Sequence, residues 1–282
     1  MRPERENEKA RTAGFTLAEM AIVLVIVGLL LTSVLSTVST QVEARNIAET
    51  QSRLNQIKDA LTGFAQANGR LPCPADGTLA TGAANAGVEQ VTVTVVGPPQ
   101  QTVCTNANGF GVVPWATLGV SETDVWGRRF GYKVSSAFSD SIVQTTTTWG
   151  CGATIPVPTP TQSSFALCAQ GTLAVTTRTA ANKVPGTSVS NVPAVVISYG
   201  KNGYGAYTTG GTQLTAPPAV NADETANATA TSTTFYSHEQ SPQTSGCSDT
   251  APNTSFCEFD DLVAYIPVSV LITRMVSAGK LP

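Results

Sequence analysis

The residues with the most distinctive chemistry lie near the start of the chain, where a small residue, an aromatic residue and a carboxylate precede an apolar run. Gly14 is followed by Phe15, and Glu19 stands four residues later at the edge of the apolar segment. A carboxylate drawn into lipid costs about 2–3 kcal/mol or more, so such a residue is usually paired or functional. Cleavage after Gly14 would create an α-amino group on Phe15, a counter-charge for Glu19 in the same chain or in a neighbour. The alternative is that Glu19 extends to the membrane interface and has no partner.

A long apolar segment follows Glu19. Between Met20 and Val42 no side chain is charged, and this run of about 23 residues can cross a hydrocarbon core of about 30 Å as a helix. We therefore predict a transmembrane or filament-core helix over residues 15–42. Residues 1–14 form a polar leader that the positive-inside rule keeps in the cytoplasm, because it carries the basic side chains Arg2, Arg5, Lys9 and Arg11.

The order of these parts differs from that of an ordinary secretory signal. Such a signal ends its apolar region at a small-residue cleavage site on the far side. Ala44 lies beyond the run here, but no A-x-A pattern marks a cleavage site, and the small residue Gly14 stands before the run instead. The order favours cleavage at Gly14.

Residues 14–19, GFTLAE, resemble the processing motif of type IV pilins and type II secretion pseudopilins. The resemblance implies that a prepilin peptidase cuts after Gly14 and that the new terminal Phe15 is methylated. It also implies that Glu19 guides assembly by neutralising the terminal amine of an adjacent subunit. No proline falls between Phe15 and Leu71, where many major pilins have one. This departure favours a pseudopilin or a minor pilin.

The helix should continue beyond the membrane as an amphipathic segment over residues 43–69. Gly69, shortly before Pro72, provides a stop, so we expect one helix over about residues 15–68. Apolar residues recur at spacings of three, four and seven, which predicts one buried face: Ile47, Leu54, Ile57, Leu61 and Phe64.

Residues 70–282 are expected to form a globular, β-rich head, so the predicted fold class is α+β, with the long helix packed on an antiparallel sheet as in pilins. After Pro267 a short amphipathic stretch ending at Gly279 predicts a final helix. Segments 76–90, 154–164 and 208–232 are rich in Thr, Ala, Gly and Pro and are predicted loops or insertions. The β-rich runs are Val91–Val95, Arg129–Val134, Leu173–Thr177, Ala194–Tyr199 and Leu262–Ile266.

A second resemblance lies in residues 124–132, DVWGRRFGY, which look like the D-x-W-G stretch where pseudopilin heads enter their sheet. We expect Trp126 to anchor the core, Gly127 to form a turn and Asp124 to bond the backbone. The alternative for Asp124 is a role as a ligand. Residues 200–205, GKNGYG, lack the spacing of a phosphate-binding loop and indicate a hairpin turn at Asn202-Gly203.

All six cysteines lie downstream of the apolar segment, and none forms a CxxC pair. An even number beyond a membrane anchor indicates disulfides formed in an oxidising compartment such as the periplasm. Six cysteines allow fifteen pairings, and buried free thiols are the alternative. We predict that sequential neighbours pair, because each pair would close a short loop: Cys73 with Cys104, Cys151 with Cys168, and Cys247 with Cys257.

Acidic residues cluster near the C-terminus, and their hard oxygen atoms are suitable ligands for calcium. Major pseudopilins carry a calcium site in a late loop, so the resemblance makes Asp260 and Asp261 our candidates, with Glu258 and Asp249 nearby. The run is not an EF-hand, and adjacent acids often only flank a strand. Calcium is the single possible cofactor that the sequence suggests.

Composition argues against an enzyme and against charge-driven nucleic-acid binding. Charged residues make up 12% of the chain, the net charge is −3, and no basic patch is present. His238, the one histidine, lies among polar residues typical of an exposed loop, and no G-x-S-x-G motif is present. We predict no catalytic residue.

The sequence thus predicts a structural subunit of a type IV pilus or type II secretion filament, and the large head favours a subunit of low abundance. It would be a single-pass protein of the inner membrane with its head in the periplasm before assembly. Its partners would be a prepilin peptidase and other pilin or pseudopilin subunits. The alternative is an uncleaved, signal-anchored periplasmic binding or adhesin domain, which would keep residues 1–14 and have no use for Glu19.

Overall fold

The computed structural model describes residues 16–95, 101–106, 108–141, 163–178, 183–186 and 188–281, with the backbone alone for residues 31–39 and Val95. The chain divides into two compact units, Met1–Ala48 and Glu49–Pro282.

Helix α1 (Leu17–Asn68) begins in the first unit, close to the predicted start. Its side chains from Leu17 to residue 30 are all exposed within the unit, although nearly all are apolar. In the part of the chain that the structure describes, no helix combines the length and the apolarity needed to cross a membrane. The predicted membrane span over residues 15–42 is therefore not confirmed.

In the second unit, the C-terminal part of α1 buries one face against the head. Leu54, Ile57 and Leu61 are buried as predicted, and Ala65 continues their stripe, whereas Phe64 is only half-buried. The helix ends at Asn68, and the N–H of Gly69 makes the last helical bond, to the carbonyl of Ala65 at 2.8 Å. The positive φ of Gly69, 74°, then turns the chain away from the helix, as the sequence predicted.

Five predicted strands are present, and the structure adds four that sequence patterns did not reveal. The predicted ones are β1 (Val91–Val95), β4 (Gly131–Val134), β5 (Leu173–Thr176), β7 (Ala194–Ser198) and β9 (Leu262–Ile266). The additional ones are β2 (Gln101–Cys104), β3 (Phe110–Val112), β6 (Val189–Val192) and β8 (Thr234–Tyr236). They form an antiparallel sheet in the order β3-β4-β7-β9, a β1-β2 hairpin and a three-stranded sheet in the order β6-β5-β8.

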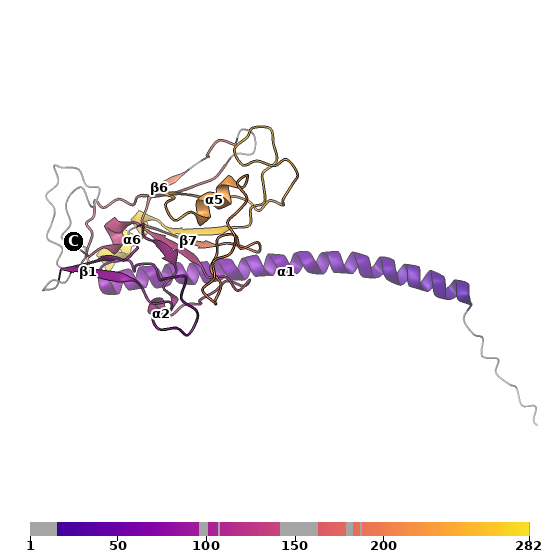
Figure 1. The fold of residues 1–282 in the computed structure, drawn as a ribbon, viewed down its shortest axis with the longest axis horizontal. Coiled ribbons are helices and arrows are strands. Elements are labelled where there is room, and N and C mark those ends of the chain that lie inside the picture. The colour runs from indigo at the N-terminus through magenta and orange to yellow at the C-terminus, as the bar shows by residue number, and fades with distance from the viewer. Residues whose placement is uncertain are drawn as a thin grey trace, which may run out of the picture. The chain divides into compact units, whose positions relative to one another are not determined.

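Strand β7 divides the core into two clusters because its successive side chains point to opposite faces. Ala194 and Val196 join the side chains of α1, while Val195 and Ile197 pack with Phe235 and others from the three-stranded sheet. The four-stranded sheet therefore lies between α1 and a second β layer. In Figure 1, helix α5 (Ala222–Ala228) lies on the side of this sheet away from the C-terminal part of α1.

Two features of the head differ from the prediction. The pairing of β5 with β8 is parallel, so the head is not wholly antiparallel. Helix α5 lies within the predicted loop 208–232 and carries no apolar stripe, because it is held by polar contacts such as those of Asn227 with Tyr236. Of the predicted loop 154–164, only residues 163 and 164 lie among the described residues. The predicted final helix is α6 (Val268–Ser277), and α2 (Trp115–Leu118) and α3 (Ser136–Ser139) are single turns.

The stretch at residues 124–132 behaves as expected for Asp124 but not for Trp126. Asp124 is buried, accepts the backbone N–H groups of Trp126 and Arg128 and receives the hydroxyl hydrogen of Ser198 at 2.7 Å. Burial raises the pKa of this carboxyl despite these bonds. Gly127 has a φ of 77° in the turn, but Trp126 is only half-buried, so the predicted core anchor is wrong.

The head contains disulfides between sequential cysteines. Cys73 is bonded to Cys104, and Cys247 to Cys257, in agreement with the predicted pairing. Cys168 is also disulfide-bonded, while its predicted partner Cys151 lies outside the described residues. The first disulfide fastens the segment after α1 to strand β2.

Candidate assembly site and acidic cluster

Glu19 and Thr16 form a reciprocal cap at the start of α1. The backbone N–H and the hydroxyl of Thr16 each donate to Oε2 of Glu19 at 2.8 Å, and the N–H of Glu19 points to Oγ1 of Thr16 at 3.3 Å. This is the capping-box arrangement of a threonine followed three residues later by a glutamate. The T-x-x-E pattern at residues 16–19 is the recognised sequence signal of such a cap, a role that the predictions for Glu19 did not include.

The capped carboxylate lies at one end of an apolar surface. Leu17 is 91% exposed, and Met20, Leu24 and Leu29 are also more than half exposed within the first unit. A helix that is apolar all round is normally buried in protein or lipid. The exposed side chains therefore require other molecules to cover them.

Both processing residues lie outside the described part of the chain. The predicted cleavage site between Gly14 and Phe15 immediately precedes Thr16. An amine created on Phe15 would be one residue from the Thr16 N–H that Glu19 already accepts. The carboxylate thus has a bonding arrangement within its own chain that an incoming amine would have to share or replace.

A second site of concentrated charge lies in the head, where Asp260 and Asp261 meet Glu224 of α5. Oxygen atoms of these three carboxyl groups lie within 4.8 Å of one another. Glu224 and Asp261 are buried and Asp260 is half-buried. Among the described residues, no arginine or lysine forms an ion pair with any of the three. The sequence thus identified two members of the cluster and missed the third.

Amide groups surround the acidic cluster without neutralising it. Asn202, in the turn after β7, donates its backbone N–H to Asp260 and its side-chain amide to Glu224, at 2.8 and 2.9 Å. Asn221 donates its side-chain amide to Glu224 at 3.3 Å, and Asn227 donates to Asp261 at 2.8 Å. The predicted turn at Asn202-Gly203 is present, but β7 pairs with β4 and β9, so it does not close a hairpin.

The electrostatics of the cluster oppose full ionisation. Burial, followed by the charges of Glu224 and Glu258, raises the pKa of Asp260 to about 7. Burial is also the main cause that raises the pKa values of Glu224 and Asp261. Oδ1 of Asp260 and Oδ1 of Asn221 are buried without a hydrogen-bond partner among the described residues. A divalent cation would compensate the charge and could use these oxygen atoms as ligands.

The two neighbouring acids named by sequence analysis have different roles. Asp249 accepts the backbone N–H groups of Asp223 and Cys257. Glu258 acts on the cluster through the charge of its side chain and through its backbone carbonyl, which accepts the side-chain amide of Asn221 at 3.3 Å. Glu224 gave no usable signal, because it lies in a segment predicted to be a loop, far from the others in sequence.

His238 is not the exposed loop residue that the sequence predicted. Its ring stacks on Phe259 with a centroid distance of 3.7 Å, and Nε2 lies 3.3 Å from a carboxylate oxygen of Asp223. Asp223 also pairs with Arg178 at 2.6 Å. The interaction partners are charged and aromatic groups from distant segments, so the local polar sequence could not reveal them.

Comparison with known proteins gives one partial match. Residues 9–35 match the family model described as "Prokaryotic N-terminal methylation motif". No curated protein and no solved structure matches the chain. The chain therefore carries the prepilin signature of type IV pilins and pseudopilins, which spans Gly14, Phe15 and Glu19. Proteins with this motif are structural rather than catalytic, and the motif implies a membrane-anchored precursor that is later assembled.

Proposed function

We propose that this chain is a structural subunit of a type IV pilus or a type II secretion filament, trimmed after Gly14 by a prepilin peptidase. The observation that carries the proposal is the prepilin signature at residues 9–35, which contains the capped Glu19 at the start of an exposed apolar helix. In a filament, the exposed apolar side chains pack against those of neighbouring subunits. Glu19 then receives the terminal amine of an adjacent Phe15.

The precursor is proposed to be a single-pass protein of the inner membrane, with residues 1–14 in the cytoplasm and the head in the periplasm. The basic leader and the uncharged run from Met20 to Val42 support this orientation. The disulfides of the head fit an oxidising compartment. Extraction of the helix from lipid into the filament exchanges one apolar environment for another.

Within this class we favour a minor pilin or a pseudopilin. No proline interrupts the chain between Phe15 and Leu71, and the structure assigns one helix from Leu17 to Asn68. The head, with inserted segments such as the one that contains α5, is large for a subunit that repeats along a whole filament. A position at the tip, or a role in initiation, accommodates such a head.

The experiment that tests this proposal is mass spectrometry of the N-terminus. The chain would be purified from membranes of a host with a prepilin peptidase and, in parallel, from a host whose peptidase gene is deleted. We expect a terminus at Phe15 with one added methyl group in the first host, and the intact leader in the second. An intact Met1 terminus in both hosts, or a cut near Ala44, would support the alternative of an anchored or secreted domain.

A second proposal concerns the acidic cluster, which we infer to bind calcium in the head. Glu224, Asp260 and Asp261 bring three carboxyl groups together without an ion pair to a described cation, and Oδ1 of Asp260 lacks a hydrogen-bond partner. The side-chain oxygen Oδ1 of Asn221 is a further candidate ligand, because the same amide group already contacts Glu224. Bound calcium would fasten α5 to the start of β9.

A further inference from the structure

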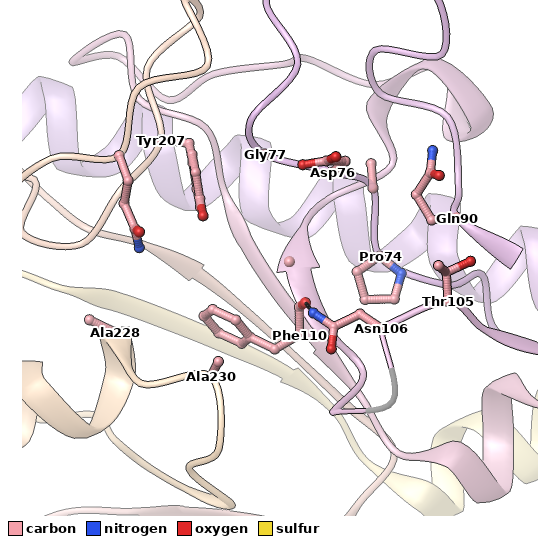
Figure 2. A pocket seen from close by; sticks show the side chains of 13 residues that line it. Pro74, Asp76, Gly77, Gln90, Thr105, Asn106, Phe110, Tyr207, Ala228 and Ala230 are labelled. Atoms are coloured by element: carbon pink, nitrogen blue, oxygen red, sulfur yellow. Dashed lines mark hydrogen bonds between the residues drawn. The ribbon is translucent and has the colours of Figure 1, made fainter.

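A cavity of about 420 Å³ lies in the head, between the segment that follows the first disulfide cysteine and the loop after β7. Figure 2 shows Asp76 and Tyr207 on one side of it, and Phe110 and Asn106 on the other. Ala230, which follows α5, lies next to Phe110. The volume is in the range of cavities that hold small organic ligands.

Rigid contacts shape the walls of this cavity. The ring of Tyr207 lies flat against Gly77, where an added Cβ atom would be 2.6 Å from the ring. Gly111 of β3 lies so close to Pro74 and Ala75 that a Cβ atom there would be 2.6 Å from the Ala75 carbonyl oxygen. Side chains at these glycines would displace the walls, so the cavity exists because both positions lack one.

The polar atoms available in the cavity are mainly hydrogen-bond acceptors. Asp76 uses Oδ1 to accept two bonds from Thr78, while Oδ2 has no partner among the described residues. The amides of Gln90 and Gln213 donate to backbone carbonyls through Nε2, so their Oε1 atoms stay available. The hydroxyl of Tyr207 adds one group that can donate or accept. A ligand for this cavity must therefore supply several donors.

The charges near the cavity disfavour an anionic ligand. Among the residues that the structure describes, no arginine or lysine lines it, and Asp76 would repel an anion. The carboxylate also contributes, after burial, to the raised pKa of Tyr207, which places both groups in one electrostatic environment. Asp76 would attract a cation, but the ammonium group of Lys133, 5.9 Å from the centre of the Phe110 ring, opposes a second positive charge on that side of the cavity.

We propose that this cavity binds a neutral saccharide unit. Sugar hydroxyl groups can donate to the free oxygen atoms of Asp76, Gln90 and Gln213, and the apolar faces of a pyranose ring can pack on Phe110 and Tyr207. The cavity would hold one or two sugar rings. This binding activity is independent of the proposed filament assembly and gives the head a ligand of its own.

The test is saturation-transfer NMR on the full chain, kept in a detergent whose headgroup contains no sugar. The probes are the methyl glycosides of glucose, galactose and N-acetylglucosamine, with galacturonate as the anionic probe and choline as the cationic probe. We expect at least one neutral glycoside to bind saturably, with a Kd in the millimolar range. Asp76→Asn should weaken this affinity by about tenfold or more, because a hydrogen bond to a charged group is lost.

Asp59→Asn is the matched control, because Asp59 is exposed on α1 and is not part of the cavity. It should bind like the unchanged chain. Ala230→Trp provides a second, independent variant that fills the cavity and should abolish binding. The proposal is overturned if no neutral glycoside binds up to about 50 mM, if galacturonate or choline binds more tightly, or if Asp76→Asn and Ala230→Trp both bind normally.

Discussion

Thr16 and Glu19 bond each other reciprocally in the first turn of α1, so the carboxylate has a structural role within its own chain. The same carboxylate is the residue that we propose to receive a neighbour's amine during assembly. One side chain thus has two competing tasks, capping its own helix and pairing across an interface. Substitutions at the two positions can separate them.

The first prediction concerns Glu19. Glu19→Gln keeps an oxygen atom that can accept the Thr16 bonds but removes the negative charge, so the cap should persist while the pairing with an amine is lost. We expect normal cleavage after Gly14. Incorporation into filaments should fall by about tenfold or more, because at least one charged contact between subunits is lost. Quantitative immunoblots of sheared filaments measure incorporation, and mass spectrometry measures cleavage.

The matched control is Thr16→Val, which removes the hydroxyl of the cap and leaves the charge of Glu19. Loss of an N-cap side chain costs about 0.5–2 kcal/mol of helix stability, so incorporation should fall much less than in Glu19→Gln. If Thr16→Val blocks assembly as strongly as Glu19→Gln, while both chains are cleaved, the cap is what assembly requires and the proposed charge pairing is wrong.

The second prediction concerns Arg129, a fully buried cation in the head. Its guanidinium group pairs with Glu122 at 2.8 Å and donates to the carbonyls of Gly77 and Leu79 at 2.9 and 2.7 Å. Arg129→Met leaves these acceptors without their donor and should lower the free energy of unfolding by about 3–5 kcal/mol. Arg53→Met, which removes a partly exposed pair with Glu49 and one bond to the carbonyl of Thr123, should cost only about 1–2 kcal/mol. Equal urea midpoints of unfolding for the two variants would contradict the prediction that Arg129 contributes more to stability than Arg53.

The third prediction concerns the two described disulfides, which close loops of different length. The cysteines are 31 residues apart in Cys73–Cys104 and 10 apart in Cys247–Cys257. By the chain-entropy relation, replacing both cysteines by serine should cost about 3–4 kcal/mol for the longer loop and about 2–3 kcal/mol for the shorter one. Denaturant unfolding under non-reducing conditions measures both values. A larger loss of unfolding free energy for the Cys247–Cys257 variant would show that loop length does not determine how much each disulfide stabilises the head.

Sequence patterns predicted the elements whose own residues determine their burial. Strand β7 is a continuous apolar run because both of its faces are covered, and the stripe through Leu54, Ile57 and Leu61 repeats with the helical period. Because these patterns are local, they can be recognised in the sequence without knowing which residues pack against them. Strand β6 is mostly exposed and gave no such signal.

The acidic cluster could be predicted only in part from local sequence patterns. Asp260 and Asp261 were identified because they are adjacent, but Glu224 reaches them from a seven-residue helix that is stabilised by tertiary hydrogen bonds. His238 was misjudged for the same reason, since Phe259 and Asp223 enclose it from other segments. Both sites depend on contacts between residues that are distant in sequence.

The last prediction follows from the raised pKa of Asp260, which is about 7 in the folded chain and has an ordinary value of 3.8. Between these pH values the folded chain holds a proton that the unfolded chain has lost, so stability without metal should fall as the pH rises from about 4 to about 7. The loss is complete only well above pH 7, where the folded chain has also released the proton. Calcium binds the ionised carboxylates, so at pH 8 it should restore stability, by about 2.7 kcal/mol when its concentration is 100 times its Kd.

Thermal unfolding of the full chain in EDTA and in calcium, at pH 5.5 and pH 8, measures this linkage. The calcium-induced rise in Tm should be larger at pH 8, because protons compete for the same oxygen atoms at pH 5.5. Asp260→Asn removes one charge from the cluster, so it should raise Tm in EDTA at pH 8 and abolish most of the calcium response. Asp59→Asn, at an exposed position, should change neither. A calcium response that Asp260→Asn leaves intact would place the ion elsewhere, because the cluster cannot bind it tightly without this carboxylate.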